Sequence, residues 1–218
     1  MAHWFDGKWG NADAMADSAF FPSRSALWFG WDATLNSSTS KDVAASMDAS
    51  CMHFVTLIRA CSRGELEHKK EWNTPDGLYA QMLLLDQYPR NCFRGTAEAF
   101  AYDPQAVKVA RRIVQGGHHK AFVSIAQFLF LVTPGQHSEH LADHEMNMDV
   151  MALATEKFPG FMADMTMGHC KEHKAVVDRF GRYPHRNALL GRECTEEELA
   201  WLNDTEKLPG WAKSQIKT

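Results

Sequence analysis

The sequence predicts an all-α protein. In about seven stretches of the 218 residues, apolar side chains recur at three- and four-residue spacing, the period of an amphipathic helix. Short connections separate these stretches, and no convincing pair of strands can be found among them. Together these observations favour a helical bundle or an array of antiparallel helical hairpins with about seven to nine helices.

In the first predicted helix the apolar repeat runs over residues 43–58. The helix is expected to stop at Gly64, a typical C-terminal cap. Thr74 is the predicted N-cap of the next helix, and Pro75 is its first residue. We expect this helix to end near residue 88, because Pro89 disfavours helical backbone in the residue before it.

Asp103-Pro104 repeats this start for a third helix, which Gly116-Gly117 closes. Residues 121–132 are apolar nearly all round, and periodicity alone does not distinguish a buried helix from a strand. A lone strand would have no partner, so we predict a helix there.

Three further helices are predicted in the last third of the chain. They cover residues 138–157, in which Ser138 is the predicted N-cap, and residues 161–179, followed by a helix that starts at Thr195. Thr195 and Glu198 have the spacing of a capping box.

Composition excludes several classes of protein. Hydrophobic residues make up 45% of the chain, enough for a packed core, and 23 Lys+Arg against 27 Asp+Glu give a net charge of −4. This balance argues against non-specific nucleic-acid binding, and no apolar run of about 18 residues indicates a membrane span. The beginning of the sequence lacks the apolar segment of a secretory signal. Five cysteines without a C-x-x-C motif are typical of free thiols, so we predict a cytoplasmic protein.

We predict one helical domain over residues 25–205. Residues 1–24 are interpreted as an N-terminal extension with Trp4, Trp9, Phe20 and Phe21 as anchors, and residues 206–218 as a tail.

A first polar cluster follows the very apolar helix that starts at Pro75. It consists of Asp86, Gln87, Arg90, Asn91 and Arg94. These residues either form a buried network that closes the helix end, or present a fork of Arg donors to a carboxylate or phosphate.

A second cluster lies in the sequence RFGRYPHRNALLGR. It consists of Arg179, Arg182, His185, Arg186, Asn187 and Arg192. The guanidinium groups either pair with acids such as Asp86 and Glu139 or receive an anionic ligand. RNA is a weaker alternative, because no further basic surface accompanies the cluster.

Histidines form a third group of candidates. His137, Ser138 and Glu139 precede His140 and His144, which share a helix face, and His137, His140 and His144 are an alternative metal-binding set.

His169 and His173 both fall on the apolar stripe predicted for the helix at residues 161–179, so we expect both to be buried. Histidine is suited to proton transfer near neutral pH.

These motifs resemble the domain-of-unknown-function 924 family. The resemblance rests on Trp72, TPDGL, LLLDQYPRNCFRGTAEAFAYDPQAVKVA, HSE and HxxVVxRFGRYPHRNxxLGR, and it extends over roughly residues 25–203. It implies an all-α fold similar to tetratricopeptide superhelices and no established reaction or cofactor. The family pattern includes the two Arg-rich clusters, His137-Ser138-Glu139 and His173, whereas His140, His144 and His169 depart from it.

We therefore expect these clusters to converge on one pocket for a small anionic molecule. Predicted catalytic residues are Asp86, His173 and His185. Predicted ligand-binding residues are Gln87, Arg90, Asn91, Arg94, His137, Ser138, Glu139, Arg179, Arg182, Arg186, Asn187 and Arg192. No P-loop, nucleophile elbow or dinucleotide motif is present, so we predict no cofactor and leave enzymatic activity open. One alternative is a tetratricopeptide-like module that binds a peptide, and a second is a divalent-metal protein.

Overall fold

Helices dominate the computed structural model. It describes residues 1–16, 20, 24, 28, 31–32, 37–38, 41–204 and 206–213. Within these residues the only strands are β1 (Trp31–Asp32) and β2 (Ser37–Ser38), which form a short antiparallel pair. The all-α prediction is confirmed. None of the described helices has the length and apolar character needed to cross a membrane.

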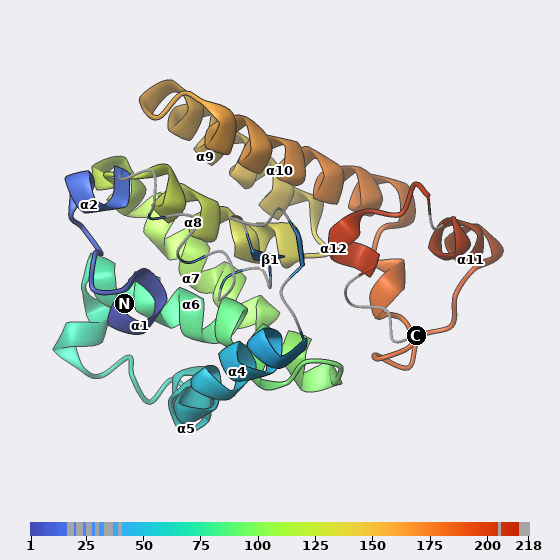
Figure 1. Ribbon diagram of the computed structural model, residues 1–218, viewed down its shortest axis with the longest axis horizontal. Helices are drawn as coiled ribbons and strands as arrows, with labels where there is room; N and C mark the ends of the chain where they lie inside the picture. The colour runs from blue at the N-terminus through green and yellow to red at the C-terminus, as the bar shows by residue number, and fades with distance from the viewer. Residues whose placement is uncertain are drawn as a thin grey trace.

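The α-helices are distributed along the whole described chain (Figure 1). They are α1 (Ala2–Phe5), α2 (Ala12–Ala16), α4 (Lys41–Cys51), α5 (Val55–Ser62), α6 (Pro75–Cys92), α7 (Asp103–Gln115), α8 (Ile125–His137), α9 (Leu141–Lys157), α10 (Phe161–Phe180), α11 (Glu196–Asn203) and α12 (Gly210–Lys213). Short 3-10 helices connect some of them: η1 (Met52–Phe54), η2 (Lys70–Asn73), η3 (Ala97–Phe100), η4 (His118–Ala121) and η5 (Pro184–Arg186).

Helix α8 lies at the centre of the packing. It contacts α6, α7, α9 and α10, and every residue from Ala126 to Gln136 is buried. The apolar run predicted as a buried helix is therefore correct in type, although α8 starts at Ile125 behind a Ser124 capping box and continues to His137. Trp4 of α1 packs on Phe130 of α8 with ring centroids 5.5 Å apart, so the N-terminal residues belong to the main core.

The predicted end of α6 near residue 88 is wrong. Pro89 lies inside the helix, and the helix continues because the amide of Phe93 donates to the Pro89 carbonyl at 2.9 Å. Helix α8 also contains a proline, Pro134, which cannot donate to the carbonyl four residues earlier. The Thr133 hydroxyl donates to that Phe130 carbonyl instead, at 2.8 Å.

Two other predicted starts also need correction. Helix α9 begins at Leu141 rather than Ser138, and its N-cap His140 makes no side-chain cap. Asp103 is the first residue of α7 and its carboxylate caps nothing, because it faces two arginines instead. The predicted caps at Thr74 and Thr195 are confirmed.

The packing of α8 against α9 makes a specific prediction about Gly135. A Cβ atom there would lie 2.5 Å from Oδ1 of the buried Asn147, so Gly135→Ala forces a displacement. We expect a loss of about 1–3 kcal/mol in the free energy of unfolding, measured by urea denaturation.

Gly168 in α10 is the matched control, because a Cβ atom there meets nothing within 4 Å. Gly168→Ala should stabilise the protein by up to about 1 kcal/mol through helix propensity. Equal effects of the two substitutions would contradict the close approach at Gly135.

Candidate functional site

The partly buried Arg90 and the buried Arg186 share one carboxylate at the start of α7. Arg90 of α6 donates through Nη2 to both Asp103 oxygens at 2.8 Å, and Arg186 of η5 donates through Nη1 to Asp103 Oδ2 at 3.3 Å. Each guanidinium carbon lies 4.8 Å from the centre of the Phe100 ring. Asp103 thus joins two segments that are far apart in the sequence.

Arg186 keeps unused donor capacity although it is only 5% exposed. Both hydrogen bonds that it makes within the described residues come from Nη1, to Asp103 and to the His137 carbonyl at 2.9 Å. Its Nε is buried and has no hydrogen-bond acceptor among the described residues. Burial, with the nearby Arg90 charge, lowers the pKa of Arg186 despite Asp103.

Asp86 and His137 form a buried pair at the facing ends of α6 and α8. His137 Nδ1 donates to Asp86 Oδ1 at 2.6 Å, and Gln87 Nε2 donates to the other oxygen. Burial opposes ionisation of Asp86, but His137, Arg90 and these hydrogen bonds outweigh it and lower the pKa of Asp86 to about 2. Asp86 therefore stays ionised and fixes the orientation of the His137 ring.

Tyr183 connects His173 of α10 to this group. Its hydroxyl donates to the Gln136 carbonyl, so His173 Nδ1, 3.0 Å away, is the donor to the Tyr183 oxygen. Burial and neighbouring positive groups lower the pKa of His173 well below its usual range. His173 is thus neutral, with Nε2 as its proton acceptor. Its ring centroid lies 6.4 Å from that of His137, and His185 lies against Tyr183 at 5.4 Å.

Glu139 and Arg192 form a second ion pair beside the same tyrosine. Arg192 donates to both Glu139 oxygens at 2.7 and 2.9 Å, and the Tyr183 amide donates to Glu139 Oε1 at 2.8 Å. Ser138 takes no part in this ion pair, because its hydroxyl donates to Asp143 Oδ2 at 2.6 Å. Of the two alternatives given for the second Arg-rich cluster, Arg192 shows the first, an ion pair with the internal acid Glu139.

Other predicted site residues lie away from Asp103. Arg94 pairs with Asp48 at 3.0 Å and donates to the Asn91 amide oxygen. Asn187 donates to Glu198 at 3.3 Å.

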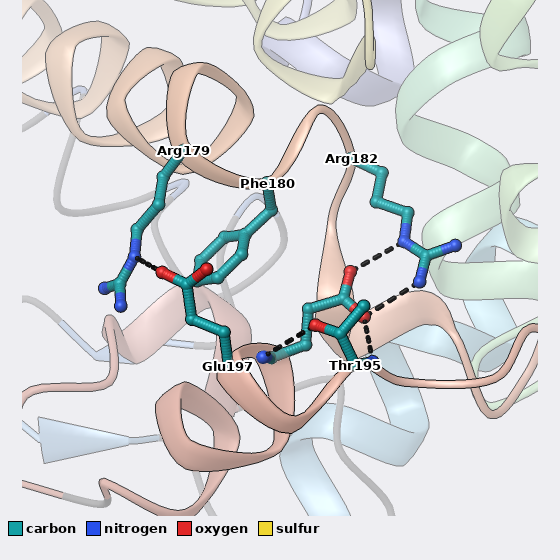
Figure 2. A pocket seen from close by; sticks show the side chains of 6 residues that line it. Arg179, Phe180, Arg182, Thr195 and Glu197 are labelled. Atoms are coloured by element: carbon teal, nitrogen blue, oxygen red, sulfur yellow. Dashed lines mark hydrogen bonds and ion pairs between the residues drawn. The ribbon is translucent and has the colours of Figure 1, made fainter.

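Arg179 and Arg182 line a different surface pocket, of about 450 Å³, between the end of α10 and α11 (Figure 2). Arg179 is paired there with Glu197 at 2.8 Å, and Arg182 with Glu198 at 2.6 Å. Both cations already have a carboxylate partner.

The three histidines of the alternative metal set have separate surroundings. His137 binds Asp86, His144 Nε2 bonds to the Ser138 carbonyl at 2.9 Å, and His140 is exposed. Across the part of the chain that the structure describes, no three His, Cys, Asp or Glu side chains are placed to hold a metal ion.

His169 is also exposed rather than buried. The buried residues of α10 are Ala163, Thr166, Cys170, His173, Val176 and Val177. His173 is therefore buried as expected, but in the turn before it Cys170 takes the buried position predicted for His169.

The comparisons with known proteins identify a family. A family model described as a bacterial protein of unknown function, DUF924, matches residues 3–206. The chain belongs to the DUF924 family. A solved structure, a protein of unknown function from Agrobacterium tumefaciens, is 36% identical, with a TM-score of 0.63 over 73% of this chain and 85% of that one. No curated protein sequence matches.

Asp103, Tyr183 and Phe100 belong to this candidate site and were not among the residues expected from the sequence. Asp103 was interpreted as a helix start, although its segment, AYDPQAVKV, is part of the motif that resembles the family. The RYPHRN motif belongs to the same family pattern, and this shared membership is the one sequence signal that could have suggested Asp103 as a partner for Arg186. Tyr183 and Phe100 are aromatic residues directly inside these motifs.

Removing the Asp103 charge should destabilise the fold strongly. Asp103→Asn leaves Arg90 and Arg186 buried without their carboxylate, and we expect a loss of about 3–5 kcal/mol in the free energy of unfolding. Urea denaturation measures it. The control is Asp178→Asn, which removes an exposed pair with Lys174 worth less than about 1 kcal/mol. Similar losses in both variants would refute the central role of Asp103.

The lowered pKa of Asp86 predicts that part of the free energy of unfolding is lost in acid. Its pKa is about 2 in the folded protein and about 4 in an unfolded chain, so the stabilisation is present above pH 4 and is lost as the pH falls toward 2. Between pH 5 and pH 3, the wild type should lose about 1 kcal/mol more than Asp86→Asn in urea denaturation. Parallel pH profiles would show that Asp86 is not held ionised.

Proposed function

We propose that this DUF924 chain binds a small anionic ligand, carrying a carboxylate or phosphate, on the unused edge of the Arg186 guanidinium. We further propose that the Asp86–His137 pair supplies acid–base chemistry beside it. The single observation that carries the proposal is the buried Arg186 Nε without an acceptor among the described residues, next to a carboxylate that Arg90 already occupies.

The geometry of Arg186 favours an anion over a neutral ligand. A guanidinium binds a carboxylate or phosphate best through two parallel N–H groups on one edge, and Nε and Nη2 form such an edge. A buried donor without an acceptor costs about 1–3 kcal/mol, so an anion at this edge gains that amount in addition to its Coulomb attraction.

His137 is oriented for proton transfer. Asp86 occupies its Nδ1, so exchange with a ligand takes place at Nε2, and the His137 side chain is 15% exposed while that of Asp86 is 1% exposed. In this proposal Asp86 and His173 act with His137, and His185 lies next to them against Tyr183. The chemistry supported is cofactor-free hydrolysis or elimination on an anionic substrate.

The proposed ligand contacts are fewer than the sequence suggested. Arg94, Arg179 and Arg182 each pair with a carboxylate, and Arg192 donates to Glu139 through both Nη atoms, so we assign these four to the stability of the fold. Arg192 Nε is buried without an acceptor among the described residues, as Arg186 Nε is, but the hydrogen bonds of Arg186 in the same part of the chain come from Nη1 alone. All five cysteines are free thiols, which supports the proposed cytoplasmic location.

The test is a thermal-shift series with inorganic phosphate, sulfate, succinate and citrate. At ten times its Kd an anion should stabilise the wild type by about 1.4 kcal/mol, a rise in Tm of roughly 3–5 °C. Arg186→Lys keeps the charge but removes the two-donor edge, and it should lose this shift.

Arg179→Lys is the matched control, because Arg179 is exposed and paired outside the site. It should keep the full shift. If no anion stabilises the wild type, or if Arg186→Lys responds as the wild type does, the proposal is wrong. A tetratricopeptide-like peptide-binding module would give the first of these results.

A further inference from the structure

The short helix α12 brings an aromatic ring onto the histidine end of the site. The Trp211 indole stacks on the His173 imidazole, with ring centroids 3.9 Å apart and planes 18° apart. The same indole packs edge-on against His185 at 5.3 Å and Tyr183 at 5.6 Å. Figure 1 shows α12 beside the C-terminal half of α10.

Among the described residues, the buried apolar side chains of this segment, residues 208–213, belong to Leu208 and Ala212. Leu208 is 4% exposed and Ala212 is fully buried, and the Pro209 carbonyl accepts the amides of Ala212 and Lys213 at 3.0 Å. Trp211 packs with a small cluster that includes Val176 and Val177 and is separate from the main core. A single turn with so few buried apolar contacts detaches at lower cost than the helices of the main core.

The family match ends at residue 206, so α12 lies beyond the residues that the DUF924 model covers. Trp211 therefore lies outside the motifs on which the resemblance to the family rests.

We propose that residues 208–213 form a cap over His173 and His185, and that Trp211 is the residue that shields these rings until the turn detaches. Tyr183 occupies His173 Nδ1, so the position the cap protects on this ring is Nε2. Detachment uncovers the stacked face of His173 and gives a dissolved molecule access to it.

Carbethoxylation by diethyl pyrocarbonate, followed by peptide mass spectrometry, tests the cap directly. The reagent modifies neutral imidazole, so slow reaction of His173 reports shielding rather than protonation. His169 is an internal reference, because it is exposed on the same helix. In the wild type His173 should react far more slowly than His169, and Trp211→Ala should raise the His173 rate roughly tenfold with the His169 rate unchanged.

Three further variants complete the test. Trp211→Phe keeps an aromatic ring and should restore the shielding, whereas Trp201→Ala removes a neighbouring ring that contacts Phe180 and should leave the His173 rate unchanged. Ala212→Asp places a charge at a fully buried position and should detach the turn with Trp211 still present. Unchanged His173 rates in both Trp211→Ala and Ala212→Asp would overturn the proposal. Because the readout needs no ligand, failure of anion binding at Arg186 leaves this result intact.

Discussion

The Asp103 carboxylate is the constraint on which the rest of the site depends. It lies at the first turn of α7, where the helix dipole favours a negative charge, and it holds guanidinium groups from α6 and η5 together. Arg186, once held there, donates to the carbonyl of His137 at the end of α8. One buried carboxylate therefore fixes the C-terminal segment against the core and sets the position of the histidine that faces Asp86.

The proline inside α8 contributes to the polar network around Asp86. Pro134 leaves the Phe130 carbonyl without its helical donor, and the Thr133 hydroxyl takes that place. The same Thr133 oxygen accepts from the Gln87 amide at 3.2 Å, and Gln87 also donates to Asp86. A backbone irregularity in α8 is thus connected through two side chains to the ionised carboxylate. Because the network is buried and nearly every member has a partner, it defines one arrangement of α6 against α8.

Signals confined to a few consecutive residues predicted the fold well. Thr74 and Thr195 cap helices as expected, because a capping oxygen and the amide it accepts lie in the same turn. Predictions that depend on distant neighbours were less accurate. Helix α6 continues through Pro89, because the helices α5, α7 and α8 pack against it. The orientation of α10 leaves His169 exposed to solvent. Asp103 has the local pattern of a helix start, and only the tertiary approach of two arginines gives it a different role.

The charges of the site restrict where the anion that we propose can bind. Arg90 and Arg186 carry two positive charges, and Asp103 and Asp86 carry two negative ones, so the group is neutral when His137 is neutral. An anion added at Arg186 then leaves one buried charge uncompensated, which is costly in a site where the two arginines and both carboxylates are almost fully buried. The Arg90–Asp103–Arg186 group taken alone carries one net positive charge, so a direct contact with Arg186 balances the proposed anion locally. Asp86, by contrast, is occupied by His137 and Gln87, so its negative charge is separated from the Arg186 edge by these partners and does not use up the positive charge that the proposed anion needs.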